Sequence, residues 1–294
     1  MERTLILGGY GRLGRTLQAY ISQSEHEIFL QGRQEVAHLC FDPTDTSKLH
    51  AVLAQLKPDN IINLVAITNL KICEQNPKLA FIVNTQIANT IQQFLSHRDN
   101  NASNTFFLQI STDQMYCSSF PNAEDQTMPS NVYCMTKMLG EHAALMCGGT
   151  VFRTNYIGAS ADPSKPSLTD WMVKSLKNKS VISSFNNIYI NALHSSTLCK
   201  LINRALSRKR AGLFNVGTSS CYSKSDIIRH LGQCLHLDTS YVKFEPATFS
   251  DNVERPLNMS MDVSKFEEEY EIKLPKHNFE LDKVSKDYKL KRMT

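Results

Sequence analysis

The sequence has no long hydrophobic run and little excess charge of either sign. Its longest apolar stretches, such as residues 61–67, have the length of a strand and are too short to cross a bilayer. Its first residues lead directly into such a stretch without the layout of a signal peptide. The net charge is +4 over 294 residues, and the basic residues form no stripe of the kind that binds nucleic acid. We therefore expect a soluble, cytoplasmic protein with neither a membrane nor a nucleic-acid partner.

Metal-binding patterns are also lacking. The eight cysteines include no CxxC pair, and no histidine-rich cluster accompanies them, so we expect no metal site. Without a secretory signal, the cysteines are expected to be reduced thiols. Hydrophobic residues make up 41% of the chain, which is ordinary for a globular protein of one large domain or two smaller ones.

What the first half of the chain does contain is a regular alternation of short apolar strands and amphipathic helices. This alternation predicts a parallel sheet with helices on both faces, a Rossmann-type doubly wound α/β fold. The expected strands are residues 4–7, 27–30, 61–65, 105–110 and 150–152, and the expected helices are residues 12–22, 47–55, 79–96 and 133–146.

After about residue 155 this alternation becomes less regular. We expect a domain boundary there, giving parts 1–155 and 156–294, with segments of the smaller C-terminal part returning to the sheet because no linker composition separates the two. The elements expected in this part are a helix at 168–176, a strand pair within 181–190, and helices at 195–206 and 223–235.

A glycine-rich loop follows the first strand directly and opens a helix. Gly8, Gly11 and Gly14 have GxxGxxG spacing. The first glycine permits a turn that a side chain would obstruct, the second lets backbone amides approach a pyrophosphate, and the third lets helix and strand pack closely. In this context the pattern predicts a dinucleotide site. Its candidate residues are Gly8, Tyr10, Gly11, Arg12, Leu13 and Gly14.

The end of the second strand sets the choice of cofactor. An acidic residue there would bind the ribose 2′-hydroxyl of NAD, but this chain has Arg33 and no carboxylate before Glu35. A guanidinium suits a 2′-phosphate, and Arg12 in the loop adds a second positive charge. This pattern favours NADPH over NADH.

A tyrosine and a lysine four residues apart open the helix expected at 133–146. Tyr133 and Lys137 share one helix face, and a neighbouring ammonium lowers the pKa of a phenol, which makes it a better proton donor at neutral pH. Lys137 would also hold the nicotinamide ribose. Thr112 ends the fourth strand at its carboxyl edge, where open α/β sheets bind ligands, and would orient a substrate carbonyl. We therefore expect Thr112, Tyr133 and Lys137 to be the catalytic residues.

With these motifs in this order, the chain resembles the extended short-chain dehydrogenases/reductases, and within them the dTDP-4-dehydrorhamnose reductase group. The similarity extends over nearly the whole chain. The matching stretches are residues 8–14, 42–45, 58–63, 80–84, 110–113, 131–141, 153–155, 214–217 and 255–262.

The resemblance implies a Rossmann domain for NAD(P)H at 1–155 and mainly a sugar-nucleotide domain at 156–294. It also implies reduction of a 4-keto sugar linked to a nucleoside diphosphate, and a homodimer. Asp42 would lie by the adenine and Ala66 would line the cofactor cleft. The residues expected to face the sugar nucleotide are Asn84, Asp113, Asn155 and Arg255, the last as a diphosphate contact.

Three alternatives keep the same fold. An epimerase usually keeps NAD tightly bound, which Arg33 argues against, and a dehydratase commonly has a glutamate where this chain has Gln114. A regulatory or binding protein without catalysis is a third alternative, although Tyr133 and Lys137 are both present. The particular sugar is left open, because residues after Ala66 and Asn155 depart from the usual pattern of the rhamnose enzymes.

Overall fold

The computed structural model describes residues 1–21, 25–97, 105–116, 121–249 and 253–290. Ser22, the expected end of the first helix, and Cys117 lie outside these ranges. The chain forms two compact units that alternate along the sequence. The first unit comprises Met1–Thr112, Pro129–Arg153 and Cys199–Phe214, and the second comprises Asp113–Met128, Thr154–Leu198 and Asn215–Thr294. Assigning cofactor binding to residues 1–155 and substrate binding to residues 156–294 stays a prediction.

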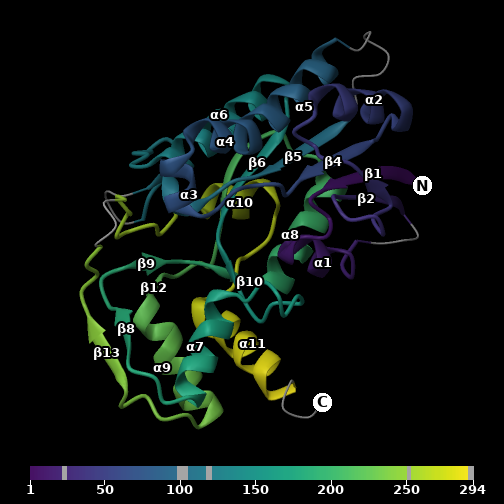
Figure 1. Cartoon of the computed structure of the whole chain (residues 1–294). Coiled ribbons are helices and arrows are strands. Elements are labelled where there is room, and N and C mark those ends of the chain that lie inside the picture. The colour runs from purple at the N-terminus through teal and green to yellow at the C-terminus, as the bar shows by residue number, and fades with distance from the viewer. Residues whose placement is uncertain (22–24, 98–104, 117–120, 250–252, 291–294) are drawn as a thin grey trace. The chain divides into compact units, whose positions relative to one another are not determined.

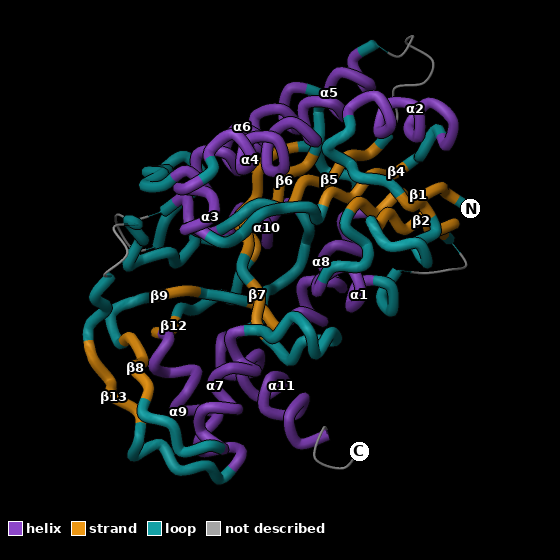
Figure 2. The backbone as a smooth tube through the Cα atoms, in the orientation of Figure 1, coloured by secondary structure: helices purple, strands orange, loops and turns teal. Residues whose placement is uncertain are grey.

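A seven-stranded sheet in the order β11-β6-β5-β4-β1-β2-β3 carries the first unit (Figure 2). The strands pair in parallel; Leu5, for example, lies in register with Phe29 on one side and Ile61 on the other. The central strands follow the order 3-2-1-4-5-6 that is typical of dinucleotide-binding folds, with β11 added at one edge. The expected doubly wound α/β class is confirmed. The strands are β1 Glu2–Leu7, β2 His26–Gly32, β3 Leu39–Cys40, β4 Asn60–Asn63, β5 Phe106–Ile110, β6 Thr150–Thr154 and β11 Gly212–Val216.

Helices cover both faces of this sheet. In Figure 1, α2, α4, α5 and α6 lie on one face, and α1 and α8 lie on the other. A core of Leu5, Ile61, Phe107, Leu53 and Ile91 fills the space between the sheet and the first group. The helices are α1 Arg12–Leu17, α2 Thr46–Leu56, α3 Leu70–Gln75, α4 Pro77–Phe81, the π-turn η1 Ile82–Gln86, α5 Ile87–Ser96, α6 Val132–Met146 and α8 Ser195–Arg208.

The helix expected at 79–96 is interrupted. It consists of α4, the π-turn η1 and α5, so one extra residue enters the helix at about Asn84. The helix expected at 12–22 ends earlier, at Leu17. The short elements β3 and α3 were not expected, because two- and six-residue segments carry too little periodicity to be detected.

Among the described residues, four α-helices, a short 3₁₀-turn and three small strand pairs form the second unit. Its core contains Met172 from α7, Leu231 and Leu235 from α9, and Leu281 and Val284 from α11. Its elements are η2 Asp113–Met115, β7 Tyr156–Ile157, α7 Leu168–Lys177, β8 Ile182–Phe185, β9 Tyr189–Ile190, β10 Leu193–His194, β12 Tyr222–Ser223, α9 Lys224–Leu235, β13 Val242–Glu245, α10 Ser264–Glu269 and α11 His277–Leu290.

We expected the two strands within residues 181–190 to pair with each other, and this expectation is wrong. Both strands exist, but β8 pairs in parallel with β13, and β9 pairs antiparallel with β12. The partners lie more than 30 residues downstream of their strands, beyond the reach of any local sequence pattern. Among the described residues, no helix combines the length and the apolar character needed to cross a membrane.

Candidate active site

The loop between β1 and α1 has the geometry that its glycines predicted. Gly8 adopts a φ of +76°, and its N–H donates a hydrogen bond of 2.9 Å to the side-chain oxygen of Gln31 on β2. A Cβ on Gly14 would lie 2.5 Å from the carbonyl oxygen of Gly9, inside any tolerable contact. Only glycine therefore fits at Gly14, and α1 starts directly against the end of β1.

Tyr10 connects this loop to the segment that carries Arg33. Its ring lies so close to Gly32 that a Cβ there would be 2.7 Å from the ring, and its hydroxyl accepts a hydrogen bond of 3.1 Å from the backbone of His38. The Arg33 side chain is 80% exposed and lies 4.0 Å from the Asp42 carboxylate. An exposed guanidinium near this loop is accessible to an anionic group.

The three expected catalytic residues are all buried in the first unit. Thr112 and Tyr133 are each 5% exposed and Lys137 is 3% exposed. Asn131 caps α6 by accepting a hydrogen bond from the backbone of Cys134, which fixes the start of the helix next to Tyr133. The Lys137 ammonium donates a hydrogen bond of 2.6 Å to the carbonyl oxygen of Ile110, two residues before Thr112. The helix and the end of β5 are therefore held together at the predicted position.

A buried ionic network supports Lys137, and the sequence analysis did not identify it. Glu141 lies one turn after Lys137 on α6 and forms a 2.7 Å ion pair with Arg153 of β6, with both side chains at most 4% exposed. Ser111 donates a further hydrogen bond to Glu141. Burial lowers the pKa of Lys137 to about 8, and the charge of Glu141 opposes that shift. The four-residue spacing between Lys137 and Glu141 could have indicated from the sequence that the two side chains share a helix face. Nothing in the sequence indicated that Arg153 of β6 pairs with Glu141.

Asn84 of η1 is hydrogen-bonded to Ile67 in the loop after β4, which also carries Ala66. The Asn84 side chain accepts from the backbone N–H of Ile67 at 2.8 Å, and it donates to the Ile67 carbonyl and to Thr136 of α6. These bonds use Asn84 as a support between this loop and α6, and a direct substrate contact by it stays a prediction. Ala66, next to Ile67, is half-buried.

The second unit gathers the other polar residues expected to bind substrate. Asn155 donates a hydrogen bond of 2.7 Å to the Asp113 carboxylate, and Asp113 is almost completely buried. Lys224, at the start of α9, was not predicted. Burial lowers its pKa, the nearby Asp113 raises it, and the positive charge of Arg255 lowers it. Electrostatic coupling therefore links Lys224 to both Asp113 and Arg255, although the three are remote in sequence.

Arg255 lines an open pocket of about 430 Å³ in the second unit. Its guanidinium donates a 2.8 Å hydrogen bond to the carbonyl oxygen of Val253 and lies 4.9 Å from the centre of the Phe249 ring. Both contacts hold the guanidinium among the residues that line the pocket, and a diphosphate contact by Arg255 stays a prediction.

The fold and these residues together define a Rossmann-type α/β protein with a buried tyrosine and a buried lysine on the helix beside its sheet. The chain matches the family described as RmlD substrate binding domain over residues 1–290, and it belongs to that family.

Relatives of known name agree with this membership. The chain is 25% identical over 288 residues to the dTDP-4-dehydrorhamnose reductase of Salmonella typhimurium, covering 92% of this chain and 93% of that protein. It is 23% identical over 277 residues to a probable low-salt glycan biosynthesis reductase of Haloferax volcanii, covering 90% and 91%. The expected family is confirmed, and the expected oxidoreductase class agrees with these reductases.

Among solved structures, the dTDP-4-dehydrorhamnose reductase of Bacillus anthracis, in complex with NADP, superposes with a TM-score of 0.84. It is 19% identical and covers 96% of this chain and 98% of its own. At that identity the likeness shows the shared fold.

Proposed function

We propose that this protein is an NADPH-dependent short-chain reductase of a 4-keto deoxysugar linked to a nucleoside diphosphate. The observation that carries the proposal is the buried contact of Lys137 with the carboxyl end of β5, on the helix that also presents Tyr133. Membership in a family with dTDP-4-dehydrorhamnose reductases supports the substrate class. A cytoplasmic location and a homodimer stay predictions.

The first unit fits a dinucleotide. The positive φ of Gly8 and the close backbone contact at Gly14 place the start of α1 at the end of β1, where backbone N–H groups suit a pyrophosphate, and the exposed Arg33 suits a 2′-phosphate. Leu13 is buried and anchors α1, while Arg12 begins that helix next to the loop. NADPH, when bound, supplies the hydride that reduces the carbonyl carbon.

The residues of this chain donate the proton to the substrate and orient its carbonyl group. Tyr133 donates its phenolic proton to the substrate oxygen as the carbonyl carbon is reduced, and Thr112 holds that oxygen by a hydrogen bond. Lys137 keeps a positive charge near the phenol below its pKa of about 8, which favours the phenolate that forms. Glu141 and Arg153 hold the Lys137 end of α6 in place.

The polar residues of the second unit are assigned to the sugar nucleotide. Asn155 and Asp113 bind sugar hydroxyls, because their mutual hydrogen bond fixes both side chains before substrate arrives. Arg255 contacts the diphosphate, and the coupled Lys224 adds a second positive charge to the same region.

Cofactor titration tests the nucleotide assignment. Removing the guanidinium in Arg33→Ala should weaken NADPH binding by roughly 10- to 100-fold, the value of one charge-assisted hydrogen bond, and leave NADH binding unchanged. Arg210→Ala removes another exposed arginine of the first unit and serves as the control. Equal affinities of the wild type for NADPH and NADH would contradict the assignment of Arg33.

Tyr133→Phe tests the proton donor. With an NDP-4-keto-6-deoxyhexose as substrate, we expect kcat for NADPH oxidation to fall roughly 10²- to 10⁴-fold with unchanged NADPH affinity. Tyr222→Phe is the matched control, because Tyr222 is equally buried and its hydroxyl is bonded to the carbonyl of Ala192. A wild-type protein that binds neither cofactor would instead favour a regulatory role, and cofactor that stays bound as NAD would favour an epimerase.

A further inference from the structure

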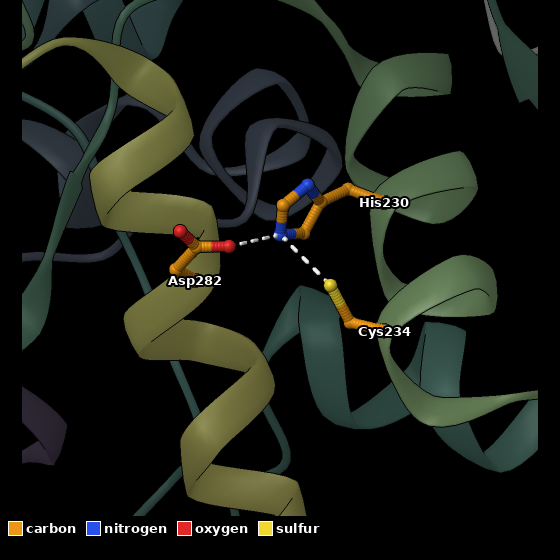
Figure 3. Close-up of side chains that lie close together, drawn as sticks. All are labelled: His230, Cys234 and Asp282. Carbon is orange, nitrogen blue, oxygen red and sulfur yellow. Dashed lines mark hydrogen bonds and ion pairs between the residues drawn. The ribbon is translucent and has the colours of Figure 1, made fainter.

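Two helices of the second unit bring a histidine, a cysteine and an aspartate together, none of which has a role in the function proposed above. His230 and Cys234 lie one turn apart on α9, and Asp282 lies on α11. Figure 3 shows the three side chains converging from the two helices. The helices pack through a shared core that includes Leu231 and Leu281, so their backbones hold the three groups in place.

One imidazole nitrogen of this cluster lies beside both the carboxylate and the thiol. Nε2 of His230 lies 3.0 Å from a carboxylate oxygen of Asp282 and 3.4 Å from the sulfur of Cys234. A neutral ring nitrogen either donates to the carboxylate or accepts from the thiol, but it cannot do both. A hydrogen bond of His230 to Asp282 therefore leaves the thiol of Cys234 as a second, longer contact of the same nitrogen.

The distances between the three side-chain atoms suit a metal ion that all three bind. Zinc binds histidine nitrogen and carboxylate oxygen at about 2.0–2.2 Å and thiolate sulfur at about 2.3 Å, so tetrahedral neighbours lie roughly 3.4–3.6 Å apart. The three ligand atoms here all lie within 4.8 Å of one another. The Asp282 side chain is 53% exposed and that of His230 is 21% exposed, so an ion and a water ligand can reach the cluster.

We propose that His230, Cys234 and Asp282 form a site for a zinc-class divalent cation that joins α9 to α11. A thiolate and an imidazole favour zinc over magnesium or calcium, which prefer oxygen ligands alone. Water completes the fourth position. This proposal departs from the sequence-based expectation of no metal site. That expectation relied on CxxC spacing, whereas the His230–Cys234 pair has the four-residue spacing of one helix face, and Asp282 joins it only in the fold.

Cobalt and zinc titrations of the full chain, without cofactor or substrate, test the site independently of the proposed reductase activity. Co²⁺ should bind at one equivalent with thiolate-to-cobalt charge-transfer absorption, and Zn²⁺ should displace it. Cys234→Ser should abolish the absorption. His230→Gln and Asp282→Asn should each weaken binding by at least the ~10- to 100-fold that loss of an outer-shell partner costs.

The controls address the other thiols and imidazoles of the chain. Cys40→Ser and His142→Gln remove an exposed cysteine and an exposed histidine of the first unit and should leave the titration unchanged. Circular dichroism of each variant establishes that it is folded. Binding that persists in Cys234→Ser, or that falls equally in Cys40→Ser, would overturn the proposal.

Alkylation gives a second measurement on the wild-type protein. One equivalent of Zn²⁺ should slow the reaction of Cys234 with iodoacetamide at least tenfold, measured on its peptide by mass spectrometry, because a metal-bound thiolate is a poor nucleophile. Mg²⁺ at the same concentration should have no effect. Equal alkylation of Cys234 with and without zinc would contradict the site.

Discussion

At the scale of single residues, the buried Lys137 ammonium is held at a cost in free energy. The residue is 3% exposed, and burial lowers the pKa of its ammonium from 10.5 to about 8. A hydrogen bond to the carbonyl of Ile110 and the charge of Glu141 recover only part of the lost hydration. A buried cation retained at such a cost is typical of a functional site.

Lys137→Met should therefore abolish reduction while stabilising the fold. The shift from 10.5 to about 8 corresponds to at most about 3 kcal/mol at neutral pH, less the value of the lost hydrogen bond. Because the folded-state pKa lies below the unfolded one, this penalty is complete below pH 8 and disappears as pH rises toward 10.5. Urea unfolding at pH 7 and pH 9.5 measures it. An advantage of the variant that grows with pH would contradict this account.

Glu141→Gln should move the alkaline limb of the pH–rate profile to lower pH. Glu141 raises the pKa of Lys137, so neutralising it lets Lys137 lose its proton earlier. The variant should also lose roughly 3–5 kcal/mol of stability, because Arg153 stays buried without its carboxylate. In the double variant Glu141→Gln/Arg153→Leu, stability should recover while the pH shift remains. If the double variant has the wild-type pH profile, Glu141 does not control the pKa of Lys137 during the reaction.

At the scale of elements, the placement of α6 depends on its close approach to the π-turn η1. A Cβ on Gly140 would lie 2.5 Å from the carbonyl oxygen of Asn84, which is backbone and cannot move cheaply. Asn84 in turn bonds to Thr136 on the same helix. The helix that carries Tyr133 and Lys137 is therefore fixed by contacts at its middle, beyond its capped start.

Gly140→Ala should push α6 away from η1 and lower both stability and activity. We expect a loss of about 1–3 kcal/mol in unfolding free energy and a larger proportional loss in kcat than in NADPH affinity. Met135→Ala, which changes an exposed position of the same helix, is the control and should alter neither. Urea denaturation and steady-state kinetics check both effects, and an unchanged kcat in Gly140→Ala would contradict the dependence on α6.

The sequence predicted those elements whose patterns are local. The strand–loop–helix around Gly8, the cap and face of α6, and the strand ends that place Thr112 all follow from periodicity and backbone sterics within a few residues. The π-turn at Asn84 could not be predicted, because its extra residue is accommodated by packing against Gly140 on another helix. The pairing of β8 with β13 likewise depends on a distant segment.

At the scale of the whole molecule, the fold brings together side chains that are distant in the sequence. These are the residues of the candidate site that we could not predict. Lys224 couples to Asp113 and Arg255 across more than thirty residues of chain in either direction. Arg153 reaches Glu141 only because β6 lies beside β5 and α6 covers the sheet. A single sequence contains the residue types but not these distances.

The fragment 1–155 should not fold as a stable domain, although it contains every residue expected to bind the cofactor. It lacks β11, which pairs with β6, and so leaves β6 as an exposed edge strand. It also lacks α8, and of the described helices only α1 stays on that face of the sheet. We expect aggregation by size-exclusion chromatography and a non-cooperative melt by circular dichroism. Co-expression with residues 156–294 should restore a soluble complex. A monomeric fragment with a cooperative melt would contradict the expectation.

The interleaving of the two units also limits how this family can diversify. Each unit is assembled from three separate stretches of chain, so no single crossover between two related genes exchanges one unit intact. New substrate preferences then have to arise by point changes in place or by joint transfer of three segments. An engineer who grafts the second unit of a relative onto this scaffold would need to move all three stretches together.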